Sequence, residues 1–357
     1  MDLVKICKTE AVCLILIATV NQVIIGAPKT ILSSSGSASL ISTFLIFILA
    51  LLIVLVIAKL FEKFKSLDII DVSSFLGGKF LKTVIAIAYW GLFFLSSLTC
   101  LSYIIEFLAT VYFKNYDIIF LTLFFLITTS FAVQKGLGAI SKVNYFFTIL
   151  SFIAIIALVI GAFPHFVPER VFPVLGDGAK NVFLINFSNI FAFGGISYLM
   201  FIMPLLKNNK DFKEISIISV IISFIYLFIS VLCVLLAFPV IATSSDLFVV
   251  YIITKIIEYN EFLERTDAIF IFFWLLSVFS YLSINLFFMQ KTFAKITHIT
   301  NPNVLSLPFS AILLGCLPLI KDVSIYYFIY NFALKWYFII LILISILILV
   351  FANIKKR

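Results

Sequence analysis

Residues that could hold a small ligand gather where long apolar runs are interrupted. The first run extends from Ala11 to Leu32, and Gly26, Pro28 and Lys29 stand inside it. A helix in lipid has to satisfy its own backbone hydrogen bonds, whereas glycine loosens a helix and proline lacks the N–H donor. Amides released at such a break can hold a carboxylate. The pattern predicts a break at Gly26–Ala27 whose free backbone groups suit a carboxylate and an amine.

A second apolar run, from Val182 to Pro204, carries Gly194 and Gly195 near its middle, just after Phe191. Glycine and proline are common in membrane helices, so a single break would have little meaning. Two breaks at matching positions instead indicate unwound segments that form one site near the middle of the membrane. We therefore expect Gly194, Gly195 and Phe191 to line the same ligand site as the first break.

An acidic side chain, Glu106, interrupts a third apolar run, and Tyr103 precedes it by one helical turn on the same face. A carboxylate inside the membrane is costly and marks a functional site by default. We predict that the two side chains form a polar path or gate beside the ligand site. The alternative is that Glu106 reaches the interface or pairs with Lys114 or Arg265.

Two serines in a later run, Ser280 and Ser283, are three residues apart and share a helix face. They are candidates to line the ligand site, and helix packing is the alternative. The segment Glu264-Arg265-Thr266-Asp267 opens the same run. It can serve as a helix cap with a surface ion pair, or as a gate or docking element.

The composition shows what positions these residues. Of 357 residues, 64% are hydrophobic and only 12% are charged, too apolar for a soluble domain of this length. The net charge of +8 comes from short basic connectors, which excludes a nucleic-acid patch and fits the positive-inside rule. Five cysteines and two histidines form no metal-ligand or catalytic spacing, so we predict neither an enzyme nor a metal or cofactor site.

We predict an all-α integral membrane protein, built as a single transmembrane domain over residues 1–357, with ten transmembrane helices. The expected spans are 11–32, 39–61, 83–111, 118–133, 143–163, 183–205, 215–240, 266–290, 304–320 and 325–351. The breaks fall in spans one and six, the first span of each half. Since five is odd, the second half enters from the opposite side. This predicts a 5+5 inverted repeat with repeat one at about 11–163 and repeat two at about 183–351.

The distribution of basic residues predicts the orientation of the chain. With a cytoplasmic N-terminus, the inner connectors hold 17 of the 25 Lys and Arg residues and the outer connectors hold 7, Lys335 among them. Both termini are therefore placed on the cytoplasmic, or core, side. The basic amphipathic connector around residues 59–82 is expected to lie at the inner lipid surface.

Three stretches resemble the spore germination permease family, the B subunits of GerA-type nutrient germinant receptors, within the amino acid/polyamine/organocation superfamily of LeuT-like fold. They are IIGAPKTIL (residues 24–32), the pair ERVFPVLGDG (169–178) and FAFGGISYLMFIMP (191–204), and LERTDAIFIFFWLLSVF (263–279). The third stretch is the most specific, and the resemblance extends over essentially the whole chain. One departure is Ile196, because the family often has a polar or acidic residue after the two glycines.

The resemblance implies a function that composition and spacing do not. It implies a multi-pass germinant-binding subunit of the spore inner membrane, sensing an amino acid or similar small nutrient. The implied partners are a receptor A subunit and a lipoprotein C subunit. The alternative is a secondary active amino-acid permease of the same superfamily, and a conduit for ions or small solutes is a third reading. No charged residue lies within 143–163, where many sodium-independent relatives keep a lysine, which speaks against proton-coupled transport.

Overall fold

The computed structural model describes residues 5–112, 118–176, 178–183, 185–239, 248–257, 266–320 and 323–356, and all regular elements among them are helices. The α-helices are α1 (Lys8–Ile25), α2 (Ala27–Ser35), α3 (Ser39–Phe61), α4 (Ile69–Val111), α5 (Ile118–Gln134), α6 (Leu137–Ala162), α7 (Ala179–Phe183), α8 (Ile196–Ile202), α9 (Phe212–Ala237), α11 (Val249–Ile256), α12 (Thr266–Thr297), α13 (Ser306–Cys316), α14 (Val323–Phe328) and α15 (Lys335–Lys355). Short 3₁₀ segments join them: η1 (Gly36–Ala38), η2 (Phe163–His165), η3 (Pro168–Val171), η4 (Ile185–Phe193), η5 (Met203–Leu205), η6 (Asn209–Asp211), η7 (Pro302–Leu305) and η8 (Leu317–Ile320). The segment η9 (Ile329–Leu334) is a π-helix.

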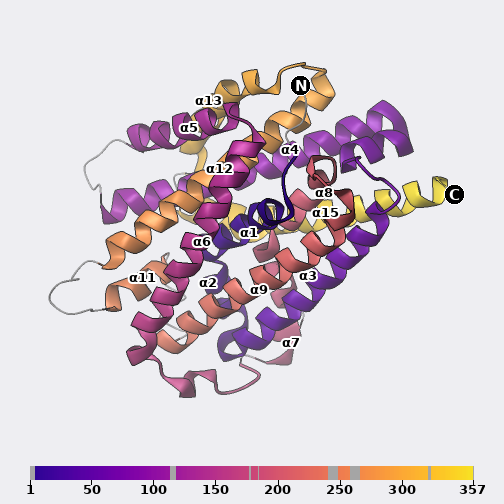
Figure 1. The fold of residues 1–357 in the computed structure, drawn as a ribbon. Helices are drawn as coiled ribbons and strands as arrows, with labels where there is room; N and C mark the ends of the chain where they lie inside the picture. Colours follow the sequence, from indigo (N-terminus) through magenta and orange to yellow (C-terminus); the bar gives the residue numbers. More distant parts are fainter. Residues whose placement is uncertain are drawn as a thin grey trace.

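Helix α1 forms the centre of the molecule, where Figure 1 looks nearly along its axis. It begins where the Glu10 carboxylate accepts a hydrogen bond from the Cys7 amide at 2.8 Å, which satisfies one of the free donors of the first turn. Every residue from Ala11 to Ile25 is buried. A helix that is apolar all round has to be covered on every side, and α6, α9, α12 and η4 pack around this one.

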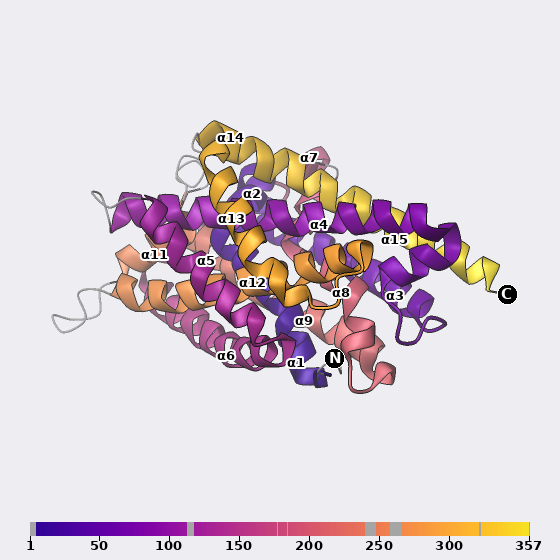
Figure 2. The ribbon, with the colours of Figure 1, turned by 90° about the horizontal axis from the view of Figure 1, so that it is seen from above.

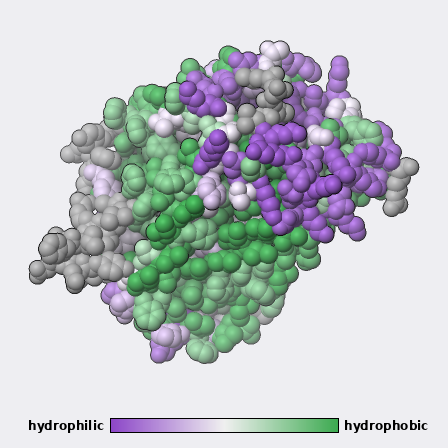
Figure 3. Space-filling model, viewed as in Figure 1, coloured by the Kyte–Doolittle hydropathy of each residue, from purple (hydrophilic) through white to green (hydrophobic). Residues whose placement is uncertain are grey.

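The outer helices expose apolar side chains, as expected of a protein that meets lipid rather than water. Phe120, Ile127 and Ile160 are each more than 60% exposed. Figure 3 shows hydrophobic residues over α3 and α9, whereas hydrophilic residues gather around α8 and the C-terminal end of α15. This separation fits a belt of lipid contact with a polar end.

Eight helical stretches among the described residues are long and apolar enough to cross a membrane, or nine if one bent pair counts as a span. The bent pair, Lys180–Phe193 and Ile196–Leu205, meets at an angle of 44° and corresponds to the expected broken sixth span. Helix α5, expected as the fourth span, is apolar but has only 17 residues. An all-helical membrane protein is thus confirmed, while the count of ten with its inverted repeat stays a prediction.

The expected inner connector is a helical extension of a long span. Asp68 caps α4, and Gly78 bends it with a φ of 65°, a conformation that favours glycine. Beyond this bend α4 runs beside α15 (Figure 2), and the Tyr89 hydroxyl lies 2.7 Å from the Ser345 hydroxyl between them. Ile69 and Ile70, in the first turn, are fully buried, so this extension packs on the rest of the protein, and its expected place at the inner lipid surface stays a prediction.

Hydrogen bonds and an ion pair hold each end of the described chain to a different neighbouring segment. Ile6 donates to the Leu205 carbonyl at 2.8 Å and its own carbonyl accepts from the Lys207 amide at 3.1 Å, so the start of α1 is joined to the end of η5. Lys8 pairs with Glu214, and Lys356 donates to the Lys63 carbonyl.

Four charged residues used in the sequence analysis need separate comment. Lys335 does not lie in an outer connector: it begins α15, inside an apolar stretch, and is only 5% exposed. The charge count assigned Lys335 to an outer connector because a single lysine between two apolar runs resembles the end of a membrane span. Lys114, Glu264 and Arg265 lie outside the described residues, as does their expected pairing or gating role.

Candidate functional site

The first predicted break is present at Gly26, between α1 and α2. Gly26 has a φ of 134°, which a residue with a side chain rarely adopts. Its amide donates to the Gln22 carbonyl at 3.1 Å, and the helical ladder resumes where Thr30 donates to the Gly26 carbonyl at 3.0 Å. Pro28 has no N–H, so the first turn of α2 presents the amides of Ala27 and Lys29 without intrahelical acceptors.

A small cavity adjoins this break. Its volume is about 10 Å³, roughly the space of one water molecule. The lining comes from the break itself, from α4 and from the last apolar stretch: Ile25, Gly26, Lys29, Thr30, Tyr103, Tyr326, Tyr327 and Tyr330. Four tyrosines and one lysine therefore surround the unwound backbone, and none of the lining residues is acidic.

Tyrosine hydroxyls satisfy polar atoms on the α1 side of the cavity. The Tyr103 hydroxyl donates to the Ile24 carbonyl at 3.0 Å, and the Tyr330 hydroxyl donates to the Gln22 side-chain oxygen at 2.8 Å. Each bond links α1 to a different neighbouring helix just before the break. A net hydrogen bond of this kind is worth about 1 kcal/mol, and leaving the buried acceptor without a partner costs more.

The α2 side of the cavity carries a buried cation. Lys29 is 8% exposed, donates to the Tyr327 hydroxyl, and has its ammonium nitrogen 4.8 Å from the centre of the Tyr327 ring. Tyr326 stacks on Tyr330 with centroids 5.9 Å apart, and its buried hydroxyl has no hydrogen-bond partner among the described residues. The cavity lining therefore contains a buried cation and no acidic side chain.

The second break has a different character. A side-chain carbon added at Gly195 would lie 2.3 Å from the Ile15 carbonyl oxygen, so this glycine lets η4–α8 approach the backbone of α1. The Gly194 carbonyl accepts from the Ser197 amide at 3.1 Å and the Ser197 hydroxyl at 2.7 Å. Neither glycine lines the cavity at the first break. The tight contact with α1 positions the second broken helix instead.

Phe191 connects the second broken helix to the cavity wall. Its ring lies 6.1 Å from the Tyr330 ring and 5.4 Å from Phe338 in edge-to-face arrangements. Nearby, the Asn189 side-chain oxygen accepts from the Lys335 ammonium at 2.6 Å, and the Asn189 amide donates to Ser34 at 3.2 Å. The tertiary structure thus links α2, η4 and α15 through polar side chains behind the cavity.

The serines of α12 lie against α1 rather than in the cavity. The Asn21 amide donates to the Ser277 carbonyl at 3.0 Å, which places α12 beside α1 one turn before the break. Ser283 donates to the Phe279 carbonyl of its own helix at 2.7 Å, whereas the buried Ser280 hydroxyl has no partner among the described residues. A second space of about 10 Å³ near Trp274 and Ser277 adjoins the same face of α1.

Glu106 is half-buried on α4, one turn beyond Tyr103. Among the described residues its carboxylate makes no hydrogen bond or ion pair, and Glu106 does not line the cavity. Of the predicted site residues, Gly26 and Tyr103 line the cavity, and Phe191 lies one ring away from it. Ala27 follows Gly26 at the start of α2 but does not line the cavity. Glu106, Gly194, Gly195, Ser280 and Ser283 lie outside this cavity.

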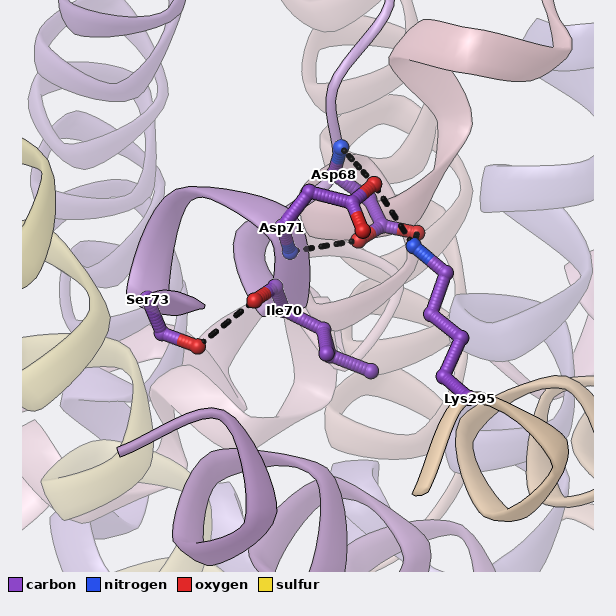
Figure 4. Close-up of polar contacts among 5 residues, drawn as sticks. All are labelled: Asp68, Ile70, Asp71, Ser73 and Lys295. Carbon is purple, nitrogen blue, oxygen red and sulfur yellow. Dashed lines mark hydrogen bonds and ion pairs between the residues drawn. The ribbon is translucent and has the colours of Figure 1, made fainter. Parts of the chain in front are cut away.

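An ion-pair cluster lies where the start of α4 meets the end of α12. Figure 4 shows the Lys295 ammonium reaching both carboxylates, at 2.6 Å from Asp68 and 2.6 Å from Asp71. Asp68 is fully buried and also accepts from the Asp71 amide at 3.2 Å. The neighbouring Ser73 hydroxyl donates to the Ile70 carbonyl at 2.7 Å. Removing one partner of a buried pair leaves a charge uncompensated, at a cost of roughly 3–5 kcal/mol, so the cluster joins the start of α4 to the end of α12.

Sequence reasoning missed several residues of the cavity. Tyr330 follows Tyr327 by three residues and Tyr326 by four, the spacings that make side chains neighbours on a helix, a signal that the search for charged groups passed over. Lys29 was noticed only as an interruption of its span. Among the described residues, no group of His, Cys, Asp and Glu is placed to hold a metal ion.

Comparisons with known proteins agree on the kind of molecule. Residues 5–325 match the model of a family described as spore germination protein. Three solved structures of an Eremococcus coleocola manganese transporter, two of variants and one in complex with an aromatic bis-isothiourea substituted compound, have TM-scores of 0.54, 0.55 and 0.55. Each is 13% identical in sequence to this chain, and the alignment covers 96–97% of this chain and 76% of the transporter chain. At this identity the likeness shows the fold, that of LeuT-type transporters. No curated protein sequence matches the chain.

Proposed function

The chain belongs to the spore germination permease family, and from that premise we propose that it is a germinant-binding membrane subunit that senses an amino acid or a similar small nutrient. The observation that carries the proposal is the cavity at the Gly26 break, where free backbone amides meet buried tyrosines. Amides at a helix N-terminus stabilise a carboxylate, and carbonyls at the end of α1 can accept from an amine.

The proposed architecture is ten transmembrane helices in a 5+5 inverted repeat, with α1/α2 and η4/α8 as the broken first and sixth spans. The bend of 44° at the second break and the LeuT-type fold support this arrangement. We place the protein in the spore inner membrane, with both termini on the core side. Its proposed partners are an A subunit and a lipoprotein C subunit.

Ligand occupancy has to be converted into a movement that partners can detect. The start of α1 is joined to the end of η5 by two backbone hydrogen bonds, so the inner halves of both broken helices are tied together. In contrast, α2 is separated from α1 by a glycine with open space around it. A ligand that binds one position of α2 more tightly shifts the equilibrium by that difference in affinity.

Deletion and restoration of this subunit in spores tests the sensing role. We expect spores without it to lose germination with one nutrient and to regain it when the subunit is restored, while germination with a non-nutrient trigger is unchanged. Spores that respond to every nutrient without this subunit would contradict the proposal.

A secondary active amino-acid permease is the second candidate, favoured by the LeuT-type fold shared over 97% of the chain. Liposomes that contain only this chain separate the two functions. Concentrative uptake of labelled amino acid, driven by a proton or sodium gradient, would establish the permease. Binding without net uptake is the result expected of a sensor.

A further inference from the structure

The polar groups around the cavity at the Gly26 break are unbalanced in charge. The Lys29 ammonium, which lines the cavity, stands over the Tyr327 ring. A second buried ammonium, that of Lys335, lies behind the cavity, 5.8 Å from the centre of the Tyr330 ring, and donates to Asn189. No residue that lines the cavity is acidic. Neither lysine forms an ion pair with a described residue, and Glu106 lies outside the cavity. A buried charge without a partner is costly in a membrane protein.

Donors without acceptors add to this imbalance. Tyr326 lines the cavity, is 7% exposed, and its hydroxyl has no partner among the described residues. The amides of Ala27 and Lys29 in the first turn of α2 lack intrahelical acceptors. The lining residues Lys29 and Tyr326 therefore offer an ammonium, a backbone amide and a hydroxyl, all of which can donate hydrogen bonds, and the amide of Ala27 lies next to Gly26 in the chain.

We propose that this cavity selects an amino acid with an acidic side chain, and that Lys29 is the residue that recognises the second carboxylate. The inference rests on the proposed function and names the class of its ligand. The α-carboxylate lies at the amides that open α2, the α-amine at the carbonyl end of α1, and the side-chain carboxylate at the Lys29 ammonium and the Tyr326 hydroxyl. A neutral amino acid leaves the Lys29 charge without a counter-ion.

The structure also explains where Lys29 stands before a ligand arrives. With a volume of about 10 Å³ the cavity is closed to anything larger than water. Lys29 donates to the Tyr327 hydroxyl and its ammonium stands over the ring, an arrangement that stabilises a cation only partly. Lys29 is three residues beyond Gly26. A rotation of α2 at the glycine would therefore move the Lys29 side chain and open the cavity at the same time.

Glutamate and glutamine test the proposal because they have nearly the same shape and differ in charge. Binding to the purified full-length chain in lipid nanodiscs is measured by calorimetry at neutral pH. We expect glutamate to bind at least tenfold more tightly than glutamine, which corresponds to about 1.4 kcal/mol. Lys29→Met should remove the preference and leave the affinity for glutamine within about threefold, since methionine keeps a similar length without the charge.

Two matched variants control the experiment. Lys29→Arg keeps the charge and should keep the preference. Lys255→Met removes an exposed lysine that stands over Tyr251 with its nitrogen 4.9 Å from the ring centre, a similar pair on α11, and should change nothing. Tyr326→Phe provides an independent variant: its hydroxyl has no partner to lose, so we expect unchanged thermal stability without ligand but weaker glutamate binding.

The outcomes distinguish the preference for an acidic amino acid from the proposed role in nutrient sensing. Equal binding of glutamate and glutamine, or a preference that survives Lys29→Met, would overturn the acidic-ligand inference and leave nutrient sensing intact. If glutamate fails to bind while alanine or glycine binds, the inference also fails and the sensing role stands. If none of the four amino acids binds, both ideas fail.

Discussion

The two broken helices differ in what their glycines do. At the first break, a side-chain carbon added to Gly26 meets nothing within 4 Å, and the backbone conformation is what requires glycine. At the second, Gly195 has an ordinary helical conformation, and the Ile15 carbonyl oxygen, 2.3 Å from the added carbon, is what requires glycine. Gly26 allows a sharp change in backbone direction beside the cavity, whereas Gly195 allows a close contact between two helices.

This difference shows that matching positions in two halves of a chain need not have matching roles. α2 has nine residues and opens with unpaired amides, whereas the seven residues of α8 follow glycines whose carbonyls accept from Ser197 and Tyr198. The second broken helix meets the α1 backbone at Gly195, and η5, which follows α8, is joined to Ile6 by a backbone hydrogen bond. The first break lines the cavity, so ligand recognition is expected to concentrate there.

Gly195→Ala should have the largest effect and tests whether the close contact of Gly195 with α1 requires a glycine. The new carbon cannot avoid the Ile15 backbone, so α1 and α8 have to separate, and overpacking of this kind costs roughly 1–3 kcal/mol or more. We expect a large loss of folded protein, measured by fluorescence-detected size-exclusion chromatography. Gly194→Ala is the matched control, since its added carbon lies 3.3 Å from the Phe191 carbonyl oxygen. Equal yields of the two variants would contradict the assignment.

Gly26→Ala tests the hinge side and should act on function more than on yield. The added carbon has room, but a φ of 134° costs a residue with a side chain roughly 1–3 kcal/mol. We expect a smaller loss of folded protein than with Gly195→Ala, and a loss of nutrient response in spores that exceeds the loss of protein, with Gly26→Val worse than Gly26→Ala. Germination at the wild-type nutrient concentration in both variants would rule out a role for this break in ligand sensing.

Tyr103→Phe should have a moderate effect confined to the first break. It removes the hydroxyl that donates to the Ile24 carbonyl and leaves the ring contacts with Phe248 and Trp274 in place. We expect a loss of about 1 kcal/mol in thermal stability and weaker ligand binding. Tyr198→Phe, which loses a bond to Asn285 away from the cavity, should lower stability to a similar degree without changing affinity.

Glu106→Gln should have the smallest effect on stability, because the carboxylate has no hydrogen bond or ion pair among the described residues. The substitution keeps the shape and removes the charge. If Glu106 belongs to a polar path or gate beside the cavity, the nutrient concentration needed for germination, or the rate of germination, should change by several-fold at normal protein level. A change in expression alone would identify Glu106 as structural.

Local signals located the first break and two residues of the cavity lining, Gly26 and Tyr103. Gly26 and Pro28 interrupt an apolar run, and the break they predict is where the structure has it. The missing part is the wall formed by Tyr326, Tyr327 and Tyr330, since no local pattern says which helix packs against the break. Lys335 shows the same limit: a lysine at the edge of an apolar run looks like a connector, and only packing against Asn189 reveals that it is buried.

The sequence by itself determined that this chain is an all-helical membrane protein, because its hydrophobic content and repeated apolar runs leave no other solvent than lipid. It also determined where the helices break, because glycine and proline act on the backbone locally. Only the tertiary structure decided which break borders a cavity and which is packed shut. That choice depends on contacts between residues far apart in the chain, such as Gly195 with Ile15 and Tyr330 with Gln22, and neither contact leaves a signal in local spacing.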